Sequence, residues 1–317
     1  MLKVLDYKGE KIKKGILKDI CHKKTFTWVD VFEPTKKELE NIAKITKIPL
    51  ADLNITLEED QRPKVIDLDG PFSLIIFGTA SFEKDEITTT PIFIYISRQN
   101  NCIITVRNRE TKSIKKLEKT ILTRTNLFQR GTGFFAYRLL DEILNIYFEV
   151  LDDIEKRIDK IEDSVVKTPD IKIVEKIFET KKTLIYFTKT MAANREVIAS
   201  IEKEYLSEID KAGAKRFRTL YNDTIQLVDM SATYRDILTG TLDTYLSSVS
   251  LSLNQVMKTL TVGASFILIP TLIASIYGMN FKIMPELHWK YGYIFSIGVM
   301  VLSIVITYAF FKGKKWI

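Results

Sequence analysis

Two long apolar runs lie near the C-terminal end of the 317-residue chain. Residues 260–277 carry no charged side chain, and neither do residues 291–311. Each run has about the 20 residues that an α-helix needs to cross the ~30 Å hydrocarbon core of a bilayer. We therefore expect a membrane hairpin, with a first span over 260–280, a short external loop over 281–290 and a second span over 291–311.

The first span continues a longer helical segment. The sequence has no proline between Gly213 and Pro270, so we expect one helix over residues 214–277, after a break at 212–214. At 1.5 Å per residue this helix would be on the order of 90 Å long. Its part before the membrane, residues 214–259, would form a cytoplasmic stalk, and Pro270 would bend the helix inside the bilayer.

Residues 1–213 have the patterns of a water-soluble α/β domain. Short runs rich in β-branched and aromatic residues predict strands, and apolar residues at helical spacing predict helices. The predicted strands cover 26–31, 72–77, 91–96 and 102–106, with a hairpin turn at 98–101; the predicted helices cover 33–46, 134–166 and 170–206. The last two helices form a helical layer over 133–208, and the fold class is a mixed-sheet α+β domain followed by the stalk helix and the hairpin.

A polar stripe follows the long predicted helix. Steps of alternately four and three residues stay on one face of a bundled helix, and here that face is small or polar instead of apolar. The stripe contains Thr219, Asn222, Gln226, Asp229, Thr233, Asp236, Gly240, Asp243, Ser247, Ser250, Asn254, Met257, Thr261, Ala264, Leu268, Thr271, Ser275 and Gly278.

Two interpretations of this stripe are open. Facing solvent explains its first half, whereas Thr261, Thr271 and Ser275 lie within the predicted span, where lining a water-filled pore explains them better. Small and hydroxylated residues also serve ordinary packing between membrane helices. Because two spans cannot enclose a pore, a channel would require an oligomer about a central axis.

The residues at the end of the first span match a known family. The segment Tyr277-Gly278-Met279-Asn280-Phe281 is followed by Met284-Pro285-Glu286-Leu287. In this place within a C-terminal hairpin, it resembles the CorA-type divalent-cation channels. The resemblance implies a funnel-shaped homopentamer in which Gly278, Met279 and Asn280 form the selectivity filter. It also implies that Asp243, Asn254 and Thr271 line the pore, and that the second span faces lipid.

Neutral oxygens suit a hydrated cation. Mg²⁺ gives up its water reluctantly, and carboxamide or hydroxyl rings can bind its intact water shell weakly enough to release it. Asn280, Thr271, Asn254 and Asp243 are therefore the candidate metal-binding residues. The alternative for Asn280 is a plain helix C-cap, since Gly and Asn commonly end helices.

Other positions on or near the stripe have two interpretations each. Met257, Leu260 and Leu268 would either form apolar constrictions that stop ions by dewetting or pack between helices. Glu286 in the external loop would either concentrate cations or be an ordinary exposed charge.

Acidic residues recur every seven positions at Asp229, Asp236 and Asp243. Around a symmetric bundle they would form rings that repel one another unless cations bind, which suggests that intracellular Mg²⁺ holds the channel closed. The regulatory metal sites of the family cannot be assigned directly to this sequence, because Thr219 and Asn222 occupy the matching stretch of the helix. Possible substitutes are Glu83, Asp85 and Asp223, for which the alternative is solvated surface charge.

Composition and the N-terminal sequence argue against several classes of protein. The net charge is +7, with a pI near 9.1, but the lysines are interspersed with acids, which argues against nucleic-acid binding. The two cysteines, Cys21 and Cys102, cannot form a disulfide framework. The N-terminus has no apolar run of signal-peptide length, so both termini should be cytoplasmic in a cell-membrane protein, with residues 312–317 as a basic tail.

Three alternative functions remain to be weighed. A tethered enzyme is not favoured, since His22 and His288 are the only histidines and no catalytic motif is evident. A membrane-anchored scaffold would not need a polar stripe. A zinc transporter shares the expected architecture but departs from Met in the triplet, so Met279 favours Mg²⁺, whereas Co²⁺ and Ni²⁺ stay possible.

Overall fold

The computed structural model describes residues 1–8, 11–15, 25–58, 60–83, 86–123, 130–167, 170–203, 206, 209, 211–282 and 284–317. Cys21, His22 and Asp85, which were named above, lie outside these residues. The chain divides into two compact units. One contains Met1–Ser164 and Asp170–Leu242, and the other consists mainly of Asp243–Ile317.

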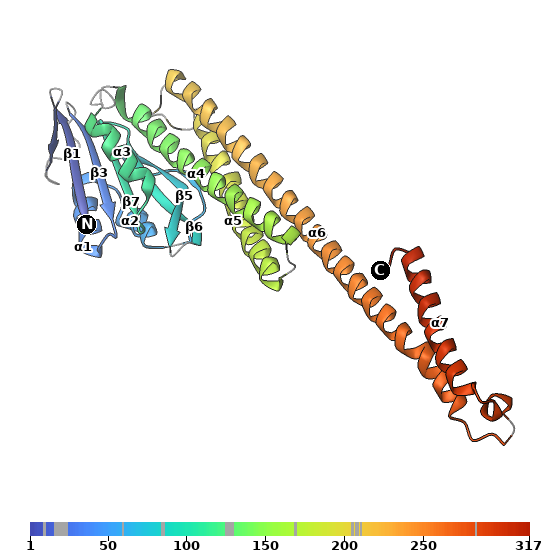
Figure 1. Cartoon of the computed structure of the whole chain (residues 1–317). Helices are drawn as coiled ribbons and strands as arrows, with labels where there is room; N and C mark the ends of the chain where they lie inside the picture. Colours follow the sequence, from blue (N-terminus) through green and yellow to red (C-terminus); the bar gives the residue numbers. More distant parts are fainter. Residues whose placement is uncertain are drawn as a thin grey trace. The chain divides into compact units, whose positions relative to one another are not determined.

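The first unit is built on a mixed sheet of seven described strands (Figure 1). Their order is β2-β1-β3-β7-β6-β5-β4; only β3 and β7 pair in parallel. The strands are β1 Leu2–Lys8, β2 Lys11–Lys14, β3 Phe26–Phe32, β4 Lys64–Asp67, β5 Phe72–Glu83, β6 Glu86–Ser97 and β7 Cys102–Arg107. The expected mixed sheet is confirmed. The four predicted strands correspond to β3, β5, β6 and β7, while β1, β2 and β4 were not predicted.

Helices cover both faces of this sheet. On one face, Val29 and Val31 of β3 share a core with Leu39 and Ile42 of α1 (Lys36–Thr46). Thr35 is the N-cap of α1 and forms a capping box with Glu38, and α1 lies within the helix predicted over residues 33–46. The short helices α2 (Leu50–Asn54) and η2 (Ile55–Leu57) follow α1.

On the other face, the alternate β3 residues Phe26 and Trp28 pack against Phe135 of α4 (Gly131–Lys167), with ring centroids 5.3 and 5.2 Å apart. The alternation of side chains along a strand thus directs one set to each helical layer. Preceding α4 is α3 (Lys112–Thr123), which was not predicted.

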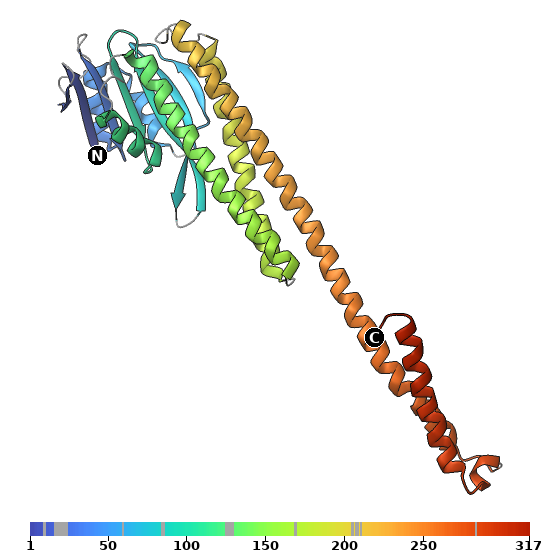
Figure 2. The ribbon, with the colours of Figure 1, turned by 45° about the horizontal axis from the view of Figure 1, so that its top comes forward.

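The helix α5 (Ile171–Glu202) is fixed to the sheet by one buried residue. Asn194 Nδ2 donates to the Gly78 carbonyl at 3.0 Å, and the Gly78 N–H donates to Asn194 Oδ1 at 2.8 Å. A side chain at position 78 would not fit, because a Cβ there would lie 2.3 Å from Thr190 Cγ2. α4, α5 and the first half of α6 run beside one another (Figure 2).

The last part of the chain contains the long helix and the hairpin. α6 extends over Lys211–Tyr277 and is continuous through Pro270. It begins before Gly213, so the break expected at residues 212–214 lies inside the helix. After η4 (Pro285–His288), α7 covers Gly292–Gly313. By length and composition, the segments Gly213–Tyr277 and Gly292–Gly313 each suffice to cross a membrane.

Candidate functional site

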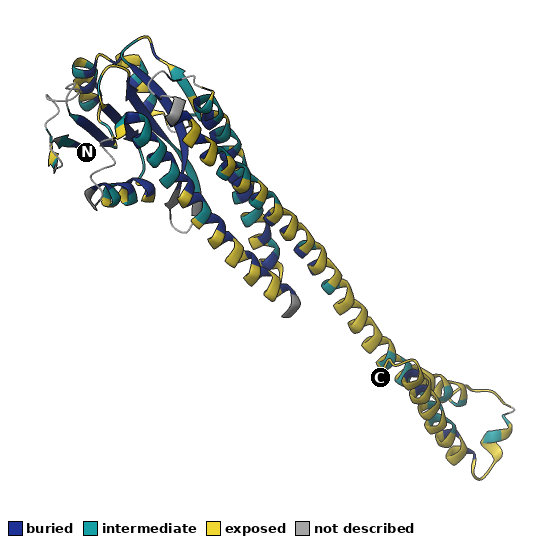
Figure 3. Ribbon diagram, turned by 90° about the horizontal axis from the view of Figure 1, so that it is seen from above, coloured by how far each residue is buried: buried dark blue, intermediate teal, exposed yellow. Residues whose placement is uncertain are grey.

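The polar stripe of α6 is uncovered along its whole length. Every residue of the stripe from Thr219 to Gly278 is exposed in the single chain. Figure 3 shows the exposed residues in yellow along the long helix. The polar face of an amphipathic helix is normally exposed, and this exposure leaves the stripe available to water, ions or other copies of the protein.

The apolar residues beside the stripe divide into two groups. The sequence pattern predicts that the apolar residues beside the stripe pack against identical neighbours. Leu227, Tyr234 and Leu238 are instead buried within the chain, so for them this prediction is wrong. In contrast, Leu253 and Val256 are 62% and 63% exposed, and all ten residues 251–260 are exposed. Exposed side chains of this size and number require lipid or a partner subunit to cover them.

The Gly-Met-Asn triplet follows directly on the last turn of α6. The Gly278 N–H donates to the Ala274 carbonyl at 2.9 Å, and the Met279 N–H donates to the Ile276 carbonyl at 3.2 Å. None of the three residues has positive φ, whereas a C-cap glycine or asparagine usually adopts the left-handed conformation. Helix capping of that kind therefore does not explain why Gly278 and Asn280 are present.

Asn280 is exposed, and its carboxamide makes no hydrogen bond to any residue that the structure describes. Its oxygen can accept bonds from a hydrated cation. Nine residues earlier, the Thr271 hydroxyl donates to the Ile267 carbonyl at 2.7 Å and keeps its own lone pairs as acceptors. Asn254, Thr261 and Ser275 are likewise exposed.

Three large apolar residues interrupt this row of oxygen acceptors. Met257, Leu260 and Leu268 are 58%, 64% and 70% exposed. Within the described residues of one chain, no group of three or more His, Cys, Asp or Glu side chains is arranged to hold a metal ion. A complete cation site on this stripe would therefore need ligands from several copies.

The second unit joins α6 to α7 through one face of α7. The residues of α7 that are buried are Gly292, Ser296, Thr307 and Phe311, and the Phe311 ring lies 6.4 Å from that of Phe266. The rest of α7 is largely exposed and apolar, as a helix in contact with lipid would be. After α7, the Trp316 ring stacks on the Phe311 ring, and the Lys258 ammonium lies 5.9 Å from the centre of the Trp316 ring.

Comparison with known proteins decides the family. A family model described as "CorA-like Mg2+ transporter protein" matches residues 23–314. The chain belongs to the CorA family. It is 38% identical to the cobalt/magnesium transport protein CorA of Methanocaldococcus jannaschii, over 92% of this chain and 91% of that one. The cobalt/magnesium transport protein CorA of Thermotoga maritima is 32% identical, over 92% of this chain and 84% of that one.

The fold agrees over the full length with that of a CorA protein. The complete structure of the CorA magnesium transporter from M. jannaschii matches with a TM-score of 0.89 at 35% identity, covering 100% of this chain and 99% of that one. This match confirms the expected soluble domain with a mixed sheet, the long helix and the two C-terminal apolar helices. CorA proteins are transporters, so the expectation that this chain is not an enzyme is confirmed through the family.

The candidate regulatory carboxylates lie in different surroundings. Asp229, Asp236 and Asp243 are exposed on the stripe. Asp223 is half-buried, and burial, with a smaller contribution from the charge of Asp141 on α4, raises its pKa. The Glu83 side chain and Asp85 lie outside the described residues.

Sequence reasoning missed Asp141, whose charge acts on Asp223, and Glu142, the next residue of α4. Arg138 Nη1 lies 2.5 Å from Asp141 Oδ2, and Arg138 Nη2 lies 3.3 Å from Glu142 Oε1. Burial raises the pKa of both carboxyls, and Arg138 partly offsets the effect. The available signal was a pair of acids inside the otherwise apolar run Leu139-Leu140 to Ile143-Leu144.

The loop between α6 and α7 is held by a close approach of backbone to backbone. A Cβ at Gly292 would lie 2.1 Å from the Glu286 carbonyl oxygen, so only glycine fits at the start of α7. Glu286 itself lies in η4 and is half-buried. The loop thus presents a carboxylate next to the segment that carries Gly278, Met279 and Asn280.

Proposed function

We propose that the chain forms a Mg²⁺ channel in the cell membrane, with the exposed stripe of α6 lining the ion pathway and Asn280 at its outer mouth. The observation that carries this proposal is the continuous exposure of the stripe from Thr219 to Gly278 on a helix that is long and apolar enough to cross a membrane. The relatives that share most of its length are named cobalt/magnesium transport proteins, which supports the cation class.

Several copies of the chain would enclose the pathway. One α6 helix exposes its polar stripe and, beside it, large apolar residues such as Leu253 and Val256, which identical neighbours would cover. The family resemblance implies five copies about a central axis. Native mass spectrometry of the detergent-purified protein tests this number, and a stable monomer would contradict the channel.

Selection would act on the hydrated ion. Rings of carboxamide and hydroxyl oxygens from Asn280, Thr271 and Asn254 hydrogen-bond the water shell of Mg²⁺ and release it readily. Gly278 and Met279 place Asn280 beyond the last turn of α6. A 2+ ion that moves down a membrane potential of 100 mV releases roughly 4.6 kcal/mol of free energy, so transport requires no other energy source.

Closing would combine apolar constrictions with acidic rings. Met257, Leu260 and Leu268 would narrow the pathway and stop ions by dewetting. Asp229, Asp236 and Asp243 would repel their copies in neighbouring subunits, and Asp223 already lies near Asp141. Bound intracellular Mg²⁺ relieves this repulsion and holds the closed state, which requires both termini and the stalk to be cytoplasmic.

Uptake into liposomes tests transport and closing together. Wild-type protein should carry Mg²⁺ when internal Mg²⁺ is low and much less when it is high. Equal uptake at both internal concentrations would support the channel but contradict closing by intracellular Mg²⁺. Transport of Zn²⁺ but not of Mg²⁺ would show that the protein is a zinc transporter. The absence of any divalent-cation flux from a folded oligomer would favour a membrane-anchored scaffold.

A further inference from the structure

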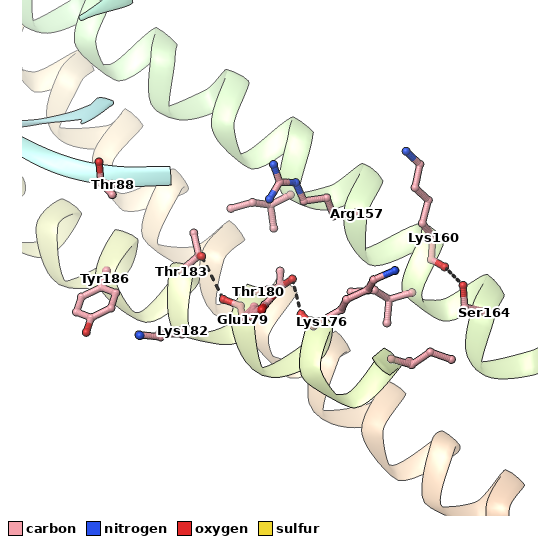
Figure 4. Close-up of a pocket in the computed structure, with 13 residues that line it drawn as sticks. Thr88, Arg157, Lys160, Ser164, Lys176, Glu179, Thr180, Lys182, Thr183 and Tyr186 are labelled. Atoms are coloured by element: carbon pink, nitrogen blue, oxygen red, sulfur yellow. Dashed lines mark hydrogen bonds between the residues drawn. The ribbon is translucent and has the colours of Figure 1, made fainter. Parts of the chain in front are cut away.

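A cleft of about 680 Å³ lies in the first unit, between α4 and α5 and beside β6 (Figure 4). Its apolar lining consists of Ile154 and Ile161 from α4 and Ile173 from α5, all of them buried. No residue of α6 lines it, so the cleft is separate from the candidate ion pathway. Its volume is within the range of about 300–1,000 Å³ that is typical of sites for organic ligands.

The charge of this cleft is opposite to the charge that a cation site requires. Arg157 and Lys160 of α4 and Lys176 and Lys182 of α5 line it, against a single carboxylate from Glu179. Arg157 and Lys160 are three residues apart and therefore share one face of α4. Such an excess of positive charge attracts anions.

Three of these cations are not neutralised within the chain. Among the residues that the structure describes, no carboxylate lies within 4 Å of the ammonium groups of Lys160, Lys176 or Lys182. By comparison, Lys156 on the same helix pairs with Asp153 at 3.4 Å. Unpaired ammonium groups around a cavity are available to phosphate oxygens.

An aromatic ring and hydroxyl groups complete the lining. Tyr186 of α5 is 55% exposed, and its ring can stack on a flat heterocycle. Thr180 and Thr183 donate to the carbonyls of Lys176 and Glu179 at 2.8 and 3.1 Å, so their oxygens remain free to accept hydrogen bonds (Figure 4).

We propose that this cleft binds a nucleoside triphosphate. Arg157, Lys160 and Lys176 hold the phosphates, and the base and sugar occupy the apolar lining and the face of Tyr186. A single phosphate would leave most of the 680 Å³ empty, whereas a nucleotide uses both the charged and the apolar sides. This inference does not depend on the proposed ion transport.

Equilibrium dialysis tests the site with full-length protein in detergent free of phospholipid. The probes are radiolabelled ATP, with and without Mg²⁺, and inorganic tripolyphosphate. We expect saturable ATP binding with a Kd below about 1 mM, weakened at least about tenfold in the double variant Lys160→Gln/Lys176→Gln. The matched control, Lys156→Gln/Lys172→Gln, removes two charges from the same helices outside the cleft and should bind as the wild type does.

A third variant tests whether the base of the nucleotide contributes to binding in addition to the phosphates. Tyr186→Ala should weaken ATP binding several-fold and leave tripolyphosphate binding unchanged. Equal losses in the cleft variant and the control, or no saturable ATP binding, would overturn the site. Tripolyphosphate binding as tightly as ATP, or binding that appears only to vesicles of anionic phospholipid, would overturn the nucleotide as its ligand. Thermal unfolding of each variant verifies that the fold is intact.

Discussion

Asp223 of α6 and Asp141 of α4 repel each other between the helical layer and the long helix. Burial is the larger cause of the raised pKa of Asp223, and the negative charge of Asp141 adds to it. Arg138 pairs with Asp141 but does not remove the effect of burial on that residue. The candidate pore helix therefore has a carboxylate in a position where an added positive charge is stabilising.

The first prediction concerns the variant Asp223→Asn. When folding raises the pKa of a carboxyl, the folded protein loses stability as the pH rises through that pKa. The reason is that the carboxyl is then charged in surroundings that disfavour the charge. At neutral pH we expect Asp223→Asn to raise stability by less than about 1 kcal/mol, since the group is partly exposed. The gain should shrink as the pH falls through the raised pKa of Asp223.

Thermal unfolding at neutral and mildly acidic pH measures this effect. Asp229→Asn, which changes an exposed carboxylate on the same helix, is the control. A variant that is less stable than the wild type at neutral pH, or a gain that is the same at both pH values, would contradict the repulsion.

A second prediction concerns the link between α5 and the sheet. Asn194→Ala leaves the buried N–H and carbonyl of Gly78 without their partners. Each buried group left unpaired costs about 1–3 kcal/mol, so for the two groups we expect a loss of about 2–6 kcal/mol. Thermal unfolding measures this loss, with Ser200→Ala, at a half-buried position on the same helix, as control. Equal stability of the two variants would show that Asn194 does not fix α5.

Two glycines of α7 provide a third, internally controlled prediction. Gly292→Ala pushes a methyl group into the Glu286 carbonyl and should cost about 1–3 kcal/mol, whereas nothing lies within 4 Å of a Cβ at Gly298. Gly298→Ala should be neutral or slightly stabilising, because alanine favours the helix. Unfolding temperatures in detergent compare the two, and equal values would mean that the close approach at Gly292 does not hold the loop.

A fourth prediction concerns the apolar constriction. Met257→Ser should let water into the closed pathway and raise Mg²⁺ uptake at high internal Mg²⁺ several-fold. Val256 is next in sequence and similarly exposed but lies off the stripe, so Val256→Ser should leave this uptake low. Radioisotope or dye-based uptake distinguishes them, and the reverse order would place Val256 on the pathway.

The sequence predicted the features that depend on long, strong patterns. The apolar spans, the proline-free helix and the strands β3, β5, β6 and β7 are all recognisable from local residues. β1, with the sequence LKVLDYK, mixes charged and apolar residues and gains its strand conformation by pairing with β3. Such pairing with distant residues is not visible in a short segment, and β2 and β4 were missed for the same reason.

The candidate site was predictable to the same extent. Spacing alone identified the stripe, because helical geometry fixes which residues share a face. It did not identify the partners of α6 in its own chain, so Leu227 and Leu238 were assigned to contacts between copies although they are buried in one chain. Asp141 escaped notice because its proximity to Asp223 depends on how α4 packs.

The most direct test of the account is the initial rate of Mg²⁺ uptake by liposomes containing wild-type protein or Asn280→Ala, at low internal Mg²⁺. Lys282→Ala, which alters an exposed residue just beyond the triplet, is the control. We expect Asn280→Ala to reduce the rate at least about tenfold, equivalent to 1.4 kcal/mol, while Lys282→Ala changes it little. A wild-type rate in Asn280→Ala, from an oligomer of unchanged size, would contradict a pathway in which Asn280 selects the ion.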